Sequence, residues 1–349
     1  MILDSEYQKS YNSQRTSGCS SSACWAPVRS MFLGLRGDVS TCCYNKTFPI
    51  GKYPDSSLHD IWFGQQRQIQ SKALADYDFS AGCHACKRII EAGNYRGLPA
   101  KNYDHLPSNS KGYPTKLDFE LSNECNLECV MCRGEFSSAI RRNREKLPKI
   151  KHPYGKELLS ELEAFLPHLD NCHFLGGEPF LIPIYIDIWE LMQKQNKQIR
   201  ISVQTNATIL STRVKRILDS MEFDIAVSID SFNKENYERI RKNGKFEDVE
   251  KNIHFLRNLC NEKGTQFTFS YCPMPQNWRE LKDAVLYANR LNCEIYFNKV
   301  DYPKECSFQS LSSADLEHVI SQLRSAELPE NNKITRLNAD AFEQVILQL

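Results

Sequence analysis

Three cysteines lie within eight residues near the middle of this 349-residue chain, at Cys125, Cys129 and Cys132. They directly follow the stretch Lys116–Leu121, in which apolar and polar residues alternate as they do in a strand with one buried face. Thiolates at such close spacing are suited to bind a metal centre. The pattern therefore predicts a strand that leads straight into a metal-binding loop.

The spacing of these cysteines favours an iron–sulfur cluster. Three thiolates can each bind one iron of a cubane cluster and leave the fourth iron open to a ligand from outside the protein. A structural zinc site normally has a fourth protein ligand close by, and the nearest downstream histidine is His152, twenty residues after Cys132. We therefore predict a [4Fe-4S] cluster on Cys125, Cys129 and Cys132, with one open, catalytic iron.

From residue 115 onward, strand-like and helix-like stretches alternate, which is typical of an α/β fold with a parallel sheet. Strands are predicted at Lys116–Leu121, Asn171–Leu175, Ile199–Thr205, Asp224–Asp230, Gln266–Tyr271 and Glu294–Asn298. Helices are predicted at 136–144, 156–166, 184–195, 211–220, 246–263 and 278–291. The strands alternate in polarity, which predicts a polar concave face lined by Glu120, Gln204, Ser270 and Asn298. Such a face suits a ligand cavity better than the packed interior of a closed barrel.

Glycines and prolines divide the chain. They are frequent from Gly93 to Pro114, which predicts a linker at 99–114. It separates a small, loop-rich, cysteine-rich domain at 1–98, with one helix near 57–74, from the strand–helix domain at 115–305. A helical, amphipathic segment at 306–349 completes the expected organisation.

The three-cysteine loop resembles the cluster motif of the radical S-adenosylmethionine (radical SAM) superfamily, which lies after the first strand of a partial (βα)6 TIM-like barrel. Other landmarks follow in order. Gly176, Gly177, Glu178 and Pro179 resemble the motif that holds the methionine amino group. Thr205 and Asn206, and then Ser228 and Asp230, are similar to positions that contact the ribose and amino-acid portions of the cofactor, and Arg241 is similar to the arginine that pairs with its carboxylate.

This resemblance implies a chemistry. The cluster would accept an electron from a donor such as flavodoxin or ferredoxin and cleave S-adenosylmethionine to methionine and a 5′-deoxyadenosyl radical, which abstracts hydrogen from a substrate. The protein would orient the substrate and exclude solvent. Cys272 follows the fifth predicted strand. We hold it as a candidate hydrogen-atom donor.

Four further cysteines, Cys24, Cys42, Cys83 and Cys86, suit a second, fully ligated site. Their surroundings resemble the twitch domain, a shortened SPASM module that carries one auxiliary [4Fe-4S] cluster and that here precedes the barrel. Cys19 could replace Cys24, and Cys43 could replace Cys42. A four-cysteine zinc ribbon is the alternative, although its ligands come in two close pairs and only one is present.

The composition of the chain limits which binding partners can be expected. The net charge of +1 gives no reason to expect nucleic acid, and no apolar stretch is long enough to span a membrane. The first residues do not have the features of an export signal. Fourteen cysteines therefore indicate metal binding in a reducing cytoplasm.

The resemblance to enzymes with a twitch domain leads us to expect oxidation or cross-linking of a peptide. The alternatives are dehydrogenation of a sugar or aminocyclitol alcohol, and a non-catalytic redox sensor.

Overall fold

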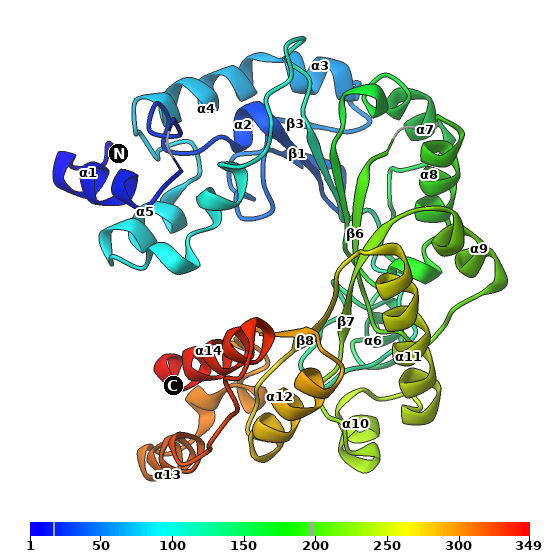
Figure 1. Cartoon of the computed structure of the whole chain (residues 1–349). Coiled ribbons are helices and arrows are strands. Elements are labelled where there is room, and N and C mark those ends of the chain that lie inside the picture. The colour runs from blue at the N-terminus through cyan, green and yellow to red at the C-terminus, as the bar shows by residue number, and fades with distance from the viewer. Residues whose placement is uncertain (17, 196–197) are drawn as a thin grey trace. The chain divides into compact units, whose positions relative to one another are not determined.

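The computed structural model describes residues 1–16, 18–195 and 198–349 (Figure 1). These residues form two compact units. The first unit contains residues 1–122, 150–176 and 184–201, and the second contains residues 123–149, 177–183 and 202–349. The predicted domain boundaries at 98, 114 and 305 do not coincide with this division, and they stay predictions.

The first unit is built on a mixed sheet with the strand order β3-β2-β1-β4-β5. The strands are β1 (Ser30–Leu33), β2 (Asp38–Ser40), β3 (Gly51–Lys52), β4 (Lys116–Phe119) and β5 (Asn171–Phe174). β1 pairs in parallel with β4, and β4 with β5, whereas β2 and β3 are antiparallel. The prediction of β4 and β5 is confirmed. β1 was missed because its four residues are all buried and show no alternation.

Helices of the first unit come mostly from its N-terminal part. They are α1 (Ser5–Ser13), α2 (Ala26–Arg29), α3 (Leu58–Phe63), α4 (Gln65–Ala75), α5 (His84–Glu91), α7 (Lys156–Leu162) and α8 (Pro183–Lys194), with 3-10 turns η1 (Tyr95–Gly97), η2 (Pro99–Tyr103) and η3 (Leu166–His168). The single helix expected at 57–74 is two helices, because Gly64 is extended between them. A side chain at Gly64 would lie 2.7 Å from the carbonyl oxygen of Asp60.

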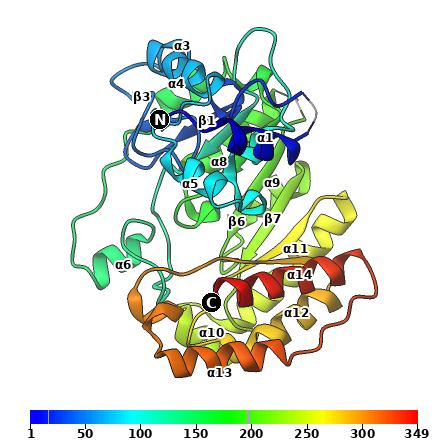
Figure 2. The same cartoon turned by 90° about the vertical axis from the view of Figure 1, so that its left-hand side faces the viewer.

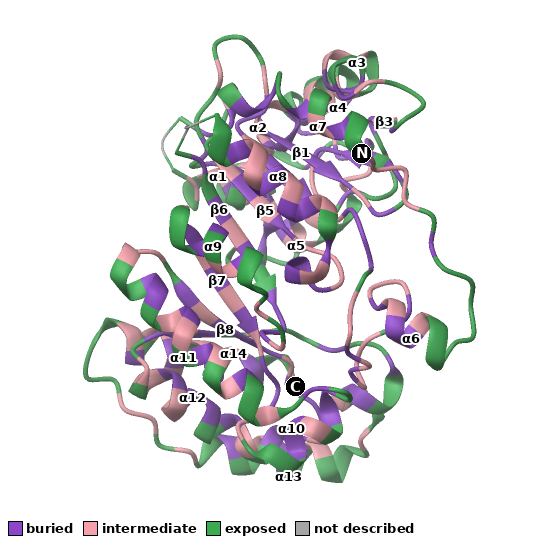
Figure 3. Ribbon diagram, turned by 90° about the vertical axis from the view of Figure 1, so that its right-hand side faces the viewer, coloured by how far each residue is buried: buried purple, intermediate pink, exposed green. Residues whose placement is uncertain are grey.

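In the second unit the strand order is β6-β7-β8-β9, and the unit contains all but the first two residues of β6. The strands are β6 (Arg200–Thr205), β7 (Phe223–Ser228), β8 (Phe267–Tyr271) and β9 (Glu294–Phe297). β7, β8 and β9 pair in parallel. With β4 and β5, all six predicted strands are confirmed. Buried and less buried residues alternate along β6 and β7, as the purple and pink bands in Figure 3 show.

The second unit also contains seven helices in its described residues. They are α6 (Ser138–Asn143), α9 (Thr212–Ser220), α10 (Lys234–Ile240), α11 (Phe246–Lys263), α12 (Leu281–Arg290), α13 (Ser313–Arg324) and α14 (Lys333–Gln348), with 3-10 turns η4 (Pro179–Leu181), η5 (Trp278–Glu280), η6 (Lys304–Cys306) and η7 (Phe308–Ser310). α11 contacts β7 and β8, and α12 and α14 contact β9. In the part of the chain that the structure describes, no helix has the length and apolar character needed to cross a lipid bilayer.

α14 covers the edge strand β9, and the two C-terminal helices lie near α12 in Figure 2. Asn338 of α14 is fully buried. Its Oδ1 accepts the backbone N–H of Ile295 at 2.9 Å, and its Nδ2 donates to the carbonyl oxygen of Cys293 at 2.9 Å and to Oδ1 of Asn289 at 2.8 Å. One amide thus satisfies backbone groups at the sheet edge that would otherwise be open.

Replacing this amide by an apolar side chain of similar size tests the role of α14. We expect Asn338→Leu to lower the free energy of unfolding by roughly 2–4 kcal/mol, because buried backbone groups lose their partners. Urea unfolding followed by circular dichroism measures the change. Gln348→Leu, an exposed change on the same helix, is the control, and an equal effect of both variants would contradict the prediction.

Candidate functional site

The segment that carries Cys125, Cys129 and Cys132 lies between β4 and α6 in the chain. We call residues 125–132 the cluster loop. Backbone hydrogen bonds tie it to the end of α10: Glu128 N–H donates to the carbonyl oxygen of Lys242 at 3.0 Å, and Val130 N–H to that of Ile240 at 2.9 Å. Ser137 Oγ donates to the Leu127 carbonyl oxygen at 2.7 Å. The middle of the loop is therefore held by hydrogen bonds to neighbouring segments.

The three thiols of the cluster loop lie in one buried environment of the second unit. Burial raises the pKa of Cys129 to about 12 and that of Cys125 to about 11, and it also raises the pKa of Cys132. Arg241 lowers the pKa of Cys129, and the other two thiols raise it further. A cluster would supply the positive charge that favours the thiolate form. The donor set therefore fits an iron–sulfur cluster.

No group of three or more His, Cys, Asp or Glu side chains within residues 1–16, 18–195 and 198–349 is arranged to hold a single metal ion. Thiolates that bind different irons of one cluster stand further apart than ligands of one ion. This finding therefore concerns sites for a single ion and not a cluster, whose irons are each bound by one thiolate.

A buried ion pair adjoins the cluster loop. Arg241 Nη2 lies 2.7 Å from Oδ2 of Asp230, which follows β7, and Arg241 Nη1 lies 4.0 Å from the sulfur of Cys129. Asp230 Oδ1 accepts the backbone N–H of Cys272 at 2.8 Å. The structure thus brings two of the predicted cofactor residues together with one predicted cluster ligand. Pairing of Arg241 with a cofactor carboxylate stays a prediction.

The two glycines of the Gly-Gly-Glu-Pro stretch pack against backbone. Gly176 has a φ of +109°, and a side chain there would lie 2.4 Å from the Ser122 carbonyl oxygen. A side chain at Gly177 would lie 2.2 Å from the carbonyl oxygen of Glu124. Only glycine allows this approach. The close neighbour of both glycines is thus the chain just before the cluster loop.

Glu178 joins this turn to the end of β6. Its Oε1 accepts from Thr205 Oγ1 at 2.6 Å and from the Phe180 N–H at 3.1 Å, and its Oε2 accepts the Asn206 N–H at 2.6 Å. Pro179 begins the 3-10 turn η4. Glu178 is 1 % exposed, and burial raises its pKa to about 7.

Asn206 in turn reaches the cluster loop. Its Nδ2 donates to Oδ1 of Asn126 at 3.1 Å and lies 3.9 Å from the sulfur of Cys125. Thr205, Asn206 and Glu178 therefore form one network with the loop. Asn126 was not singled out in the sequence, since a single loop asparagine carries no signal of its own.

A row of polar side chains crosses the strands of the second unit. Gln204 Nε2 donates to Ser228 Oγ at 3.0 Å and to Ser270 Oγ at 3.2 Å, and Asn298 Nδ2 donates to Ser270 Oγ at 2.8 Å. The polar face predicted for these strands is confirmed. Glu120, predicted for the same face, belongs to the first unit.

Cys272 lies outside this row. Its side chain packs against a buried apolar cluster formed by Ile240, Met274, Val300 and Cys306, to which Val130 and Met131 of the cluster loop also belong. Burial raises the pKa of the Cys272 thiol well above its usual value. Its assignment as a hydrogen-atom donor stays a prediction.

In the first unit, a cavity is lined by the four predicted auxiliary cysteines. Cys24 precedes α2, Cys42 follows β2, and Cys83 and Cys86 lie at the start of α5. The remaining lining residues are largely apolar: Ala26, Thr41, Leu74, Phe79, Pro99, Ala100 and Tyr103. Four thiols around an apolar cavity fit a fully ligated cluster.

The two alternative cysteines are not among the residues that line this cavity. The sulfur of Cys19 donates to the carbonyl oxygen of Asp104 at 3.3 Å. The Cys43 pKa is raised to about 12, first by burial and then by Asp118, a buried carboxylate on β4. Neither thiol therefore belongs to the lining of the cavity.

Two amides beside Cys83 were not singled out in the sequence. Asn45 Nδ2 lies 3.7 Å and Gln70 Nε2 lies 4.0 Å from the Cys83 sulfur, and both side chains also donate to the Ala81 carbonyl oxygen. N–H groups directed at a ligating sulfur orient it and tune a cluster. They come from segments far apart in the chain, so no local pattern marks them.

Comparisons with known proteins agree with this geometry. Residues 119–288 match the model of the radical SAM superfamily, and residues 24–87 match that of the iron–sulfur cluster-binding domain SPASM. Residues 119–288 therefore form a domain of the radical SAM superfamily, and residues 24–87, ahead of it, form a SPASM-type domain. The protein is a radical SAM enzyme, with S-adenosylmethionine and [4Fe-4S] clusters as cofactors.

Over the matched regions, curated relatives are about one quarter identical to this chain. Mycofactocin maturase MftC of Mycolicibacterium smegmatis is 27% identical over 54% of this chain and 45% of its own length. GTP 3′,8-cyclase of Synechocystis is 27% identical over 53% of this chain and 54% of its own. The subtilosin biosynthesis protein AlbA of Bacillus subtilis is 26% identical over 62% and 45%. The chain thus spans about half the length of these relatives.

Among solved structures, SuiB of Streptococcus suis bound to S-adenosylmethionine superposes with a TM-score of 0.45 and 14% identity, over 74% of this chain and 57% of SuiB.

The raised pKa of Glu178 predicts a pH effect on stability. A carboxyl group with a pKa of about 7 in the folded protein and 4.5 in the unfolded chain stabilises the fold when protonated. That contribution is complete below pH 4.5 and is lost as the pH rises through about 7. Relative to Glu178→Gln, the free energy of unfolding of the wild type should fall by roughly 3 kcal/mol over this range.

Urea unfolding at a series of pH values measures this difference. Glu317→Gln, at an exposed site on α13, is the control and should titrate like the wild type. Parallel pH profiles of the wild type and Glu178→Gln would show that the Glu178 pKa is not raised.

Proposed function

We propose that the chain binds its S-adenosylmethionine-cleaving cluster through Cys125, Cys129 and Cys132. The observation that carries this proposal is the convergence of three thiols, one buried and two partly buried, with the Asp230–Arg241 pair and the Glu178–Thr205–Asn206 network within one unit. When bound, the cluster and S-adenosylmethionine supply a 5′-deoxyadenosyl radical by reductive cleavage. This chemistry needs an open iron, which three protein ligands leave.

The residues around the cluster loop have separable tasks in this proposal. Glu178 holds the end of β6 so that Thr205 and Asn206 keep their backbone positions. Arg241 places a fixed positive charge beside Cys129, which favours the thiolate that binds iron. Ser228 and its hydrogen-bonded neighbours offer polar contacts for ribose or substrate.

In the first unit we propose an auxiliary [4Fe-4S] cluster on Cys24, Cys42, Cys83 and Cys86. The four-cysteine cavity supports this set over one with Cys19 or Cys43. With no open iron, such a cluster can serve as an acceptor for the electron released when a substrate radical is oxidised. Tyr103 and Phe79 line the same cavity and would limit access of water to it.

The two assignments predict distinct iron contents. We expect about eight irons per chain in the reconstituted wild type and about four in Cys129→Ala or Cys83→Ala. Only Cys129→Ala should lose formation of 5′-deoxyadenosine, by at least about 100-fold, since it removes a ligand of the cluster that cleaves the cofactor. Cys19→Ala and Cys43→Ala are matched controls that should keep all the iron.

Iron and sulfide analysis, together with chromatography of 5′-deoxyadenosine under anaerobic conditions, measures these values. Parental activity in Cys129→Ala would refute the radical-generating site. Loss of iron in Cys43→Ala but not in Cys42→Ala would reassign the auxiliary ligand.

As substrate we propose a peptide that is oxidised or cross-linked. The support is the match to relatives named as a maturase and as a bacteriocin biosynthesis protein, together with the SPASM-type domain. A small molecule is the second candidate, favoured by the match to GTP 3′,8-cyclase. All fourteen cysteines are free thiols, which suits the reducing cytoplasm where we place the protein.

Hydrogen transfer distinguishes these substrates. The enzyme is incubated with S-adenosylmethionine and extracts of its source cells grown in deuterated medium, separated into small molecules and larger material. We expect deuterium in 5′-deoxyadenosine with the larger fraction, and loss of that transfer after protease treatment. Transfer only from the small-molecule fraction would contradict the peptide substrate.

A further inference from the structure

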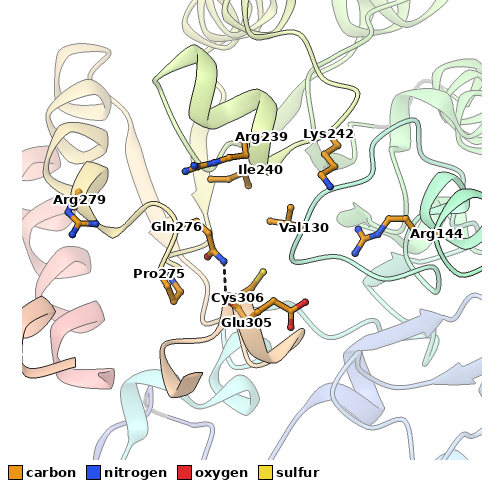
Figure 4. Close-up of a pocket in the computed structure, with 10 residues that line it drawn as sticks. All are labelled: Val130, Arg144, Arg239, Ile240, Lys242, Pro275, Gln276, Arg279, Glu305 and Cys306. Atoms are coloured by element: carbon orange, nitrogen blue, oxygen red, sulfur yellow. Dashed lines mark hydrogen bonds between the residues drawn. The ribbon is translucent and has the colours of Figure 1, made fainter. Parts of the chain in front are cut away.

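A surface pocket of about 550 Å³ lies against the cluster loop within the second unit (Figure 4). Val130 of that loop forms part of its wall, as do Ile240 at the end of α10 and Cys306 of η6. The pocket was not foreseen from the sequence, since its lining comes from five separate segments. None of its lining residues belongs to the polar row or the proposed cofactor residues.

The pocket carries strong positive charge. Of its ten lining residues, four are cationic, namely Arg144, Arg239, Lys242 and Arg279, and one, Glu305, is acidic. In Figure 4, Arg144 and Lys242 stand on the right of the pocket, and Arg239 and Arg279 on the left. The four cationic side chains belong to exposed residues.

The chain next to the pocket extends this charge. Residues 133–149, which include α6, contain six Lys or Arg and two Glu. The protein as a whole has a net charge of only +1. Positive charge is therefore concentrated beside the cluster loop, and a concentration of one sign steers partners of the opposite sign.

The pocket lies directly behind the proposed cluster ligands. Val130 stands between Cys129 and Cys132 in sequence and packs with Ile240 and Cys306 in the apolar cluster that also includes Met131. Arg144 Nη1 donates to the carbonyl oxygen of Cys129 at 3.1 Å. A molecule seated in the pocket would thus contact the cluster loop itself at Val130.

We propose that this basic pocket is the docking site of a small acidic protein that carries one low-potential electron, of the flavodoxin or ferredoxin class. The inference rests on the proposed function, which requires one electron for each cleavage. On docking, the reduced group of the carrier is oxidised by one electron and the cluster is reduced by one. Exposed cations around a shallow pocket fit a protein surface with acidic side chains, because such pairs speed association while each contributes little affinity.

The test uses cluster-loaded protein and a purified, acidic bacterial flavodoxin. The pocket variant is Lys242→Glu/Arg279→Glu, which avoids the Arg144 contact to the loop. The matched control is Arg216→Glu/Lys251→Glu, which makes the same charge change at exposed sites on α9 and α11 that do not line the pocket. Flavodoxin association is measured by biolayer interferometry at low and high salt, and cluster reduction by stopped-flow absorbance.

We expect the pocket variant to associate with flavodoxin at least about tenfold more slowly at low salt, and the control less than about twofold. High salt should narrow the difference between wild type and pocket variant. Reduced methyl viologen, a small cationic donor that needs no docking surface, should reduce the cluster of both variants at the wild-type rate or faster. Glu305→Gln, which removes the one acidic group, should strengthen flavodoxin binding severalfold.

Equal flavodoxin association by the pocket variant and the control would overturn the proposal. If the pocket variant lost iron, Glu305→Gln would replace it in the test. Unchanged flavodoxin association by Glu305→Gln would then overturn the proposal. Tighter binding of short duplex DNA than of flavodoxin, lost in the same variant, would make the pocket a nucleic-acid site instead. Absence of 5′-deoxyadenosine from wild type with either donor would refute the proposed function, whereas flavodoxin association would still test the docking site.

Discussion

The buried ion pair between Asp230 and Arg241 connects the parts of the candidate site. The two side chains are 0 % and 7 % exposed, and their charged atoms lie 2.7 Å apart. Asp230 also receives the backbone N–H of Cys272, and Arg241 reaches toward Cys129. Removing either partner of such a pair leaves an uncompensated buried charge, which typically costs about 3–5 kcal/mol. The pair therefore constrains β7, the end of α10 and the cluster loop together.

The second unit gathers its polar groups where parallel strands end. Thr205 closes β6, Asp230 follows β7, and Cys272 follows β8. Strands that pair in parallel present their carboxyl ends at one edge of the sheet, so side chains far apart in the chain become neighbours. Burial there has electrostatic consequences, since it raises the pKa of Glu178 and of the cluster-loop thiols. The same burial keeps water away from groups that would hold a reactive cofactor.

Local patterns were sufficient for much of the fold. The alternation of β6 and β7 predicted both strands and their polar side, because side chains of a strand point to opposite faces. The three-cysteine spacing located the cluster loop. Short or fully buried elements were not predicted from the sequence. β1 has four buried residues and no alternation, and α10 has only seven residues. For the same reason the N-terminal region was expected to be loop-rich, although it contributes three strands to the sheet of the first unit.

The sequence by itself determined which cofactors the chain is suited to bind. The cysteine spacing and the Gly-Gly-Glu-Pro stretch are local features, so they do not depend on how the rest of the chain folds. Only the tertiary structure decided which groups meet. It paired Arg241 with Asp230, placed Cys24 and Cys42 with Cys83 and Cys86 around one cavity, and left Cys19 and Cys43 out of its lining. It also assembled the basic pocket behind Val130. Contacts between distant segments depend on how helices and strands pack, and no local pattern encodes that packing.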